Sequence, residues 1–156
     1  MQGRRLVEMA RKWLGALSKG MICHEVEAIA MEGLQVVQAR KGFILCHFLV
    51  PRRLSDRDGN WHVGAMATLI DNVGGAAIWS SVGNVKSTVN LNISYYSTAK
   101  IQEEVEIEAK VVAEKETLVA VVVEIRKRSN GELVALGKQW MATGMTTVNI
   151  TEFSKL

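Results

Sequence analysis

The chain has 156 residues, of which 48% are hydrophobic and 22% are charged, and its net charge is +3. This composition predicts one globular domain with a sizeable core and leaves no room for two ordinary domains. No apolar run reaches the ~18 residues of a membrane span, and the mild positive charge suits an anionic small molecule better than nucleic acid. We therefore expect neither a membrane span nor a nucleic-acid partner.

Residues 1–20 predict an amphipathic helix, because apolar side chains recur at helical spacing among basic ones. The apolar positions are Leu6, Met9, Ala10, Trp13, Leu14 and Leu17. Such a segment is either an organellar transit peptide or a helix that docks on the domain. Glu8 and the low serine content favour the docked helix. We expect it to cover apolar surface and to take no part in catalysis.

The next segments predict two strands, a loop and a long helix. Residues 33–51 indicate two strands joined by a tight turn at 40–42, the second ending at Pro51, and 52–60 is a polar loop. A helix follows from about His62 to Ser81, with Gly74 and Gly75 in its interior. Each glycine costs roughly 1 kcal/mol of helix propensity, which makes sense if a sheet wraps closely around the helix.

From residue 85 onward the pattern is that of strands, at 85–97, 103–112, 117–129 and 132–144. In 103–112, apolar and charged residues alternate, as in an antiparallel sheet with one solvated face, and Asn130-Gly131 is a hairpin turn. The sequence predicts an α+β fold with an antiparallel sheet packed on a central helix. We divide this single domain, 1–156, into the N-terminal helix, a core at 21–148 and a tail at 149–156.

Asp71 is an isolated carboxylate in the middle of the apolar helix. Burial of a charged carboxylate is costly, so the residue needs either a structural partner or a chemical task. Cys23 and Cys46 have neither CxxC nor metal-ligand spacing, which favours two free thiols in a reducing compartment over a disulfide. An intracellular, cytoplasmic protein is the simplest expectation, with an organelle as the alternative.

The stretch "HVGAMATLID" at 62–71, followed by "STVNLNISYYSTAK" at 87–100, resembles the hotdog-fold acyl-CoA thioesterases. The most similar branch is that of the phenylacetate-degradation thioesterases and thioesterase superfamily member 2. The resemblance runs from about Asp56 to Gly144. It implies a hotdog fold, with the sheet curled around the long helix, and subunits paired edge to edge with active sites at their interface.

The same resemblance implies roles for five residues. Asp71 takes the place of the acidic catalytic residue, and Thr88 that of a hydroxyl residue that holds the attacking water. The backbone amides of Val63 and Gly64 fall where the thioester carbonyl is polarised. Asp56 falls at the position of an auxiliary residue of the site. Two departures stand out: Val63 replaces a glycine, and Asp56 replaces an asparagine that could donate a hydrogen bond.

The composite site also follows from distance. A helix N-terminus offers free amides to a developing oxyanion, and Asp71 offers a base. Asp71 lies eight positions after Val63, which is roughly 12 Å along a helix. One carbonyl cannot meet both groups, so the two must come from different subunits. We expect a homodimer with 85–97 at the seam, and a homotetramer as a further option.

The sequence thus predicts an acyl-CoA thioesterase that yields free acid and coenzyme A and uses neither metal nor redox cofactor. Asp71 would be the base or nucleophile. His62 has a positional role, and Lys86 and Lys115 are candidates for the phosphates of coenzyme A, as are Lys100 and Lys138. One rival is a non-catalytic acyl-CoA-binding protein of the same fold. Another is a hydratase or dehydratase, which would need a histidine beside the carboxylate.

Overall fold

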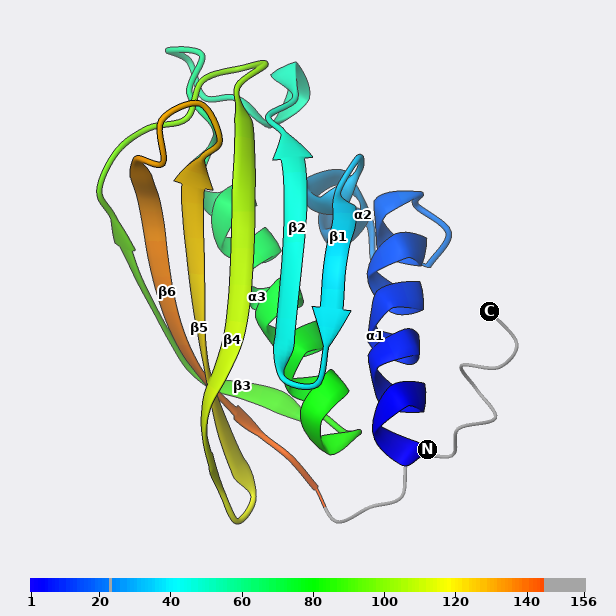
Figure 1. The fold of residues 1–156 in the computed structure, drawn as a ribbon. Helices are drawn as coiled ribbons and strands as arrows, with labels where there is room; N and C mark the ends of the chain where they lie inside the picture. The colour runs from blue at the N-terminus through cyan, green and yellow to red at the C-terminus, as the bar shows by residue number, and fades with distance from the viewer. Residues whose placement is uncertain (23, 145–156) are drawn as a thin grey trace.

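The computed structural model describes residues 1–22 and 24–144, in which six antiparallel strands form one sheet on a long helix (Figure 1). The strand order is β1-β2-β4-β5-β6-β3. The strands are β1 (Gln35–Arg40), β2 (Phe43–Leu49), β3 (Ser87–Tyr95), β4 (Glu104–Lys115), β5 (Leu118–Lys127) and β6 (Leu133–Ala142). The helices are α1 (Gln2–Ser18), α2 (Glu25–Met31), α3 (Val63–Val82) and a 3-10 turn, η1 (Arg52–Leu54). The α+β prediction is confirmed.

The central helix α3 has a defined cap at each end. The His62 ring Nδ1 accepts a hydrogen bond from the Gly64 amide at 3.0 Å, and Gly83 ends the helix in the left-handed region at φ 77°. Ten of its 20 residues are buried and eight more are half-buried, because β2, β4, β5 and β6 pack on one side and α1 on another. This enclosure explains why the helix is apolar almost all the way round.

The two interior glycines of α3 have different surroundings. A Cβ on Gly74 would collide with Gln139 Oε1 and would lie 3.1 Å from Val121 Cγ1, so the sheet does approach closely there, as predicted. A Cβ on Gly75 would make only an ordinary contact, 3.6 Å from Met141 Cε. Close packing against the sheet therefore does not account for Gly75.

The sheet follows the alternation read from the sequence. In β4, Val105, Ile107 and Ala109 are fully buried, and the intervening glutamates point to the other face. The turn at 130–131 is confirmed: Asn130 Oδ1 accepts from the Glu132 amide at 2.9 Å, and Gly131 has a φ of 74°. β3 lies at the end of the sheet and, within the described part of the chain, pairs only with β6.

Helix α1 docks beside α3 and β1, which confirms the docked-helix prediction (Figure 1). Its own residues Ala10, Leu14 and Leu17 are almost completely buried. The short helix α2 was not predicted, because its seven residues are too few to display a helical period. It packs between α1 and α3 and so helps to hold α1 in place.

Cys46 is a buried free thiol in β2, and burial raises its pKa to about 12, which keeps it protonated. Cys23 and the predicted tail at 149–156 lie outside the described residues.

Within residues 1–22 and 24–144, no helix has the length and apolarity needed to cross a bilayer. The same residues hold no group of His, Cys, Asp and Glu side chains arranged as metal ligands.

Candidate active site

Asp71, Thr88 and Gln139 meet at one point, although they come from α3, β3 and β6. The Thr88 hydroxyl donates to Asp71 Oδ1 at 2.7 Å, and the Gln139 side-chain amide donates to the same oxygen. Gln139 Nε2 also donates to Thr88 Oγ1 at 3.2 Å. Two donors thus hold one oxygen of Asp71, while among the described residues Oδ2 has no hydrogen-bond partner.

Gln139 was not identified from the sequence, yet it is the buried anchor of this network. Its exposed fraction is 1%, and its Oε1 has no partner among the described residues. The missing Cβ of Gly74 makes the room that this side chain occupies. A signal was present: strand alternation places Gln139 on the inward face between Gly137 and Met141, where a polar residue needs a reason.

The start of α3 holds a second group of predicted residues. The Gly64 amide already donates to His62 Nδ1, so His62 caps the helix. The Val63 amide, by contrast, has no partner among the described residues. Tyr95 Oη donates to the Val63 carbonyl at 3.1 Å and ties the end of β3 to the helix start. Of the two predicted amides, Val63's is the one that remains open to a ligand.

Asp56 closes its own loop instead of presenting a donor. Its Oδ1 accepts from the backbone amides of Asn60 at 2.9 Å and Asp58 at 2.8 Å. These bonds, with the Asn60 amide contributing most, hold the pKa of Asp56 below its usual value. At neutral pH the carboxyl group is therefore ionised and acts only as an acceptor, which does not fit the auxiliary donor role considered for it.

The two groups do not meet within one chain. Asp71 lies eight residues beyond Val63 on the same continuous helix, a rise of roughly 12 Å. The candidate lysines are also separated: Lys86 lies close to Thr88, whereas Lys115 lies at the end of β4, before the turn into β5. The structure thus brings Asp71 and Thr88 into contact, with Lys86 lining the same cavity, and leaves Val63, Gly64, His62 and Asp56 at the N-terminal end of α3.

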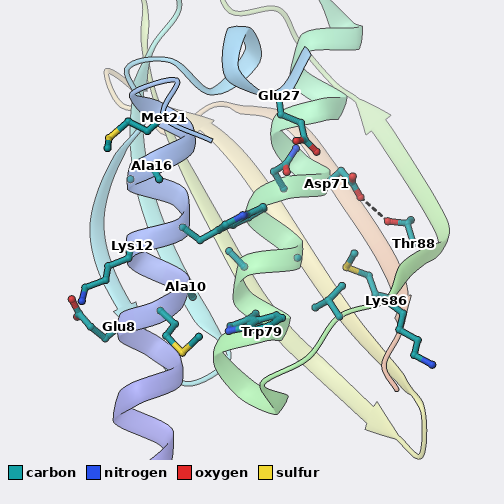
Figure 2. A pocket seen from close by; sticks show the side chains of 18 of the residues that line it. Glu8, Ala10, Lys12, Ala16, Met21, Glu27, Asp71, Trp79, Lys86 and Thr88 are labelled. Atoms are coloured by element: carbon teal, nitrogen blue, oxygen red, sulfur yellow. Dashed lines mark hydrogen bonds between the residues drawn. The ribbon is translucent and has the colours of Figure 1, made fainter. Parts of the chain in front are cut away.

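A cavity of about 920 Å³ opens beside Asp71, between α1, α3 and the start of β3. Figure 2 shows Asp71 and Thr88 on its β3 side, with Lys12 and Ala16 of α1 across from them. Glu27 of α2 and Trp79 of α3 also line it. The expectation that α1 only covers apolar surface is therefore incomplete, because α1 forms one wall of the cavity that holds Asp71.

This arrangement can perform proton transfer. The carboxylate of Asp71 is half-buried, fixed through one oxygen, and free at the other oxygen beside an apolar cavity. Such a group can take a proton from water that attacks a bound electrophile. A helix N-terminal amide, such as that of Val63, can stabilise the negative charge that develops on the electrophile's oxygen.

Comparisons with known proteins agree with this geometry. Residues 58–134 match the family model "Thioesterase superfamily". Human acyl-coenzyme A thioesterase 13 is 31% identical over 106 residues, which are 67% of this chain and 76% of that protein.

Among solved structures, zebrafish thioesterase superfamily member 2 superimposes with a TM-score of 0.80 at 27% identity, over 88% of this chain and 98% of that one. A hypothetical thioesterase from Streptococcus pneumoniae, solved with coenzyme A, has a TM-score of 0.69 at 23% identity, over 72% and 87%. These matches confirm the predicted hotdog fold.

Proposed function

Because the chain belongs to the thioesterase superfamily, we propose that it hydrolyses an acyl-CoA thioester to a free carboxylic acid and coenzyme A. The observation that carries the proposal is the carboxylate of Asp71, held by Thr88 and Gln139 in the wall of a large cavity. Two further facts support it: the human relative is named for this activity, and the Streptococcus pneumoniae protein was solved with coenzyme A.

In the proposed reaction, a water molecule donates one hydrogen bond to Asp71 Oδ2 and the other to Thr88 Oγ1. The geometry suits this, because the Thr88 hydroxyl donates its hydrogen bond to Asp71 and accepts one from Gln139. The second lone pair of Thr88 Oγ1 is then available to accept from the water. Asp71 takes the proton as the water attacks the thioester carbon. The tetrahedral intermediate then expels coenzyme A as its thiolate, Asp71 gives the thiolate the proton it took from water, and the acid is released.

The oxyanion donor in this proposal is the Val63 amide of a second subunit, because the Asp71 carboxylate and the Val63 amide of one chain lie too far apart to act on one carbonyl. β3 lies at the sheet end and carries exposed Val89, so it offers both an edge and apolar surface for a partner. Lys86 lines the same cavity as Asp71 and is therefore better placed than Lys115 for the phosphates of coenzyme A.

We expect sedimentation to give a homodimer, or a tetramer built from dimers, at the concentrations used for assays. The proposed site is incomplete in a single chain, so hydrolysis and dimerisation should be lost together on dilution. Activity per subunit should be followed over the same dilution series. A monomer with full hydrolytic activity would overturn the composite site.

The proposed function is tested with a panel of acyl-CoA thioesters and a reagent that detects the released thiol. Hydrolysis of at least one thioester with saturable kinetics supports it. The rival function, binding without turnover, is favoured by the ionised Asp56 and by the side chain at Val63. It requires that acyl-CoA binds measurably, by calorimetry for example, while no thiol appears.

Replacing Gln139 with methionine should lower kcat by roughly tenfold or more, with a smaller change in KM. A hydrogen bond to a charged group contributes about 1.5–3 kcal/mol, and methionine keeps the volume without a donor. Gln139 is a positioning residue here, so the kcat-to-KM split separates its role from loss of folding. Equal losses of kcat and of folded protein would contradict the assignment.

A further inference from the structure

The cavity between α1 and α3 contains a space that the proposed chemistry does not use. It continues past Asp71 along α3 to Trp79, a distance of two helical turns. The whole cavity, at about 920 Å³, lies at the upper end of the roughly 300–1,000 Å³ typical of small-molecule sites. We propose that this space receives the acyl chain of the substrate, and that Gly75 and Ala16 set the chain length it accepts. This inference rests on the proposed function.

Gly75 lies four residues after Asp71, so it occupies the same side of α3 one turn further on. It lines the cavity, and a Cβ there would touch Met141 at 3.6 Å without a clash. Its neighbour Gly74 faces the sheet instead, where a Cβ would strike Gln139. The missing side chain of Gly75 therefore keeps the passage beyond Asp71 open.

The opposite wall comes from α1. Met9, Trp13 and Ala16 all line the cavity, and their spacing places them on one face of the helix. Across from them stand Ala76 and Trp79 of α3. Apolar side chains thus flank the space from both helices, while Lys12 and Lys86 lie at its rim (Figure 2). An aliphatic chain that begins at a thioester near Asp71 would be buried along this passage.

The test compares hydrolysis of hexanoyl-CoA and palmitoyl-CoA by the unmodified protein and by two narrowing variants. Gly75→Leu narrows the passage from α3, and Ala16→Leu narrows it from α1 with little change in helix propensity. Each should lower the palmitoyl-to-hexanoyl ratio of kcat/KM at least tenfold, because the loss of even one methylene's fit changes rates by about 10-fold or more. The control is Gly3→Leu, on α1 outside the cavity, where an added Cβ would meet no atom within 4 Å. This variant should leave the ratio unchanged.

Binding of palmitic acid provides a readout that does not depend on turnover. Trp13 and Trp79 line the cavity, so palmitic acid should change the tryptophan fluorescence of the original protein and less so that of Gly75→Leu. If the unmodified protein hydrolyses no thioester but binds palmitic acid in this way, the proposed function fails and the cavity assignment stands. If it hydrolyses both thioesters and neither narrowing variant changes the ratio, the cavity assignment is overturned and the function stands.

Discussion

Replacing Asp71 with asparagine is expected to lower turnover by about 10² or more, the usual scale for the loss of a general base. Asparagine keeps the shape of the side chain, and its Oδ1 can still accept from Thr88 and Gln139. What disappears is the negative charge and the ability of Oδ2 to take a proton. Binding of acyl-CoA and the midpoint of thermal unfolding should therefore remain close to those of the original protein.

Steady-state kinetics and calorimetry on the same preparations check this expectation. Thr88→Ala is the matched comparison, and it should lose less activity, because a water molecule can partly replace the hydroxyl. Should Asp71→Asn retain full turnover, or lose turnover only in proportion to its folded fraction, the carboxylate would be structural and the proposed chemistry would be wrong.

Replacing Val63 with proline is expected to lower kcat by about 10²–10³, the usual cost of one missing oxyanion donor. Proline deletes only the N–H group of residue 63, and this position is the first of α3, where proline is well tolerated. The preceding residue, His62, has φ −63° and ψ 128°, the extended conformation that proline prefers before it. The carbonyl that accepts from Tyr95 is retained.

The control is Val63→Ala, which shortens the same side chain but keeps the amide. It should fold and turn over substrate at a rate near that of the original protein. Equal activity in the proline and alanine variants would show that the Val63 amide is not the oxyanion donor.

Mixing Asp71→Asn subunits with Val63→Pro subunits tests where these two groups meet. In a mixed dimer, one site would combine asparagine with proline and be inactive. The other would combine an intact Asp71 with an intact Val63 amide. After exchange of equal amounts, about a quarter of the original activity should return. If subunit exchange is demonstrated and no activity returns, the two groups do not share a site across the interface.

The sequence by itself determined the elements whose signals are local. The long apolar helix, its start at His62, the alternating strand β4 and the Asn130-Gly131 turn are all present as predicted. Each depends on periodicity or on residues within a few positions, which the chain order displays directly. The motif around Asp71 and Thr88 also named two residues that do contact each other.

Other features were decided only by the tertiary structure. Gln139 reaches Asp71 across 68 positions, because the sheet order places β6 beside β3 and the strand register turns Gln139 inward. The Gly64 amide donates to the His62 ring, whereas the Val63 amide stays available to a ligand. This difference depends on the orientation of the His62 ring. The place of α1 beside Asp71 depends on how two helices pack. These contacts form between faces of different helices and strands. The sequence pattern shows which face of an element is apolar, but not which face of another element packs against it.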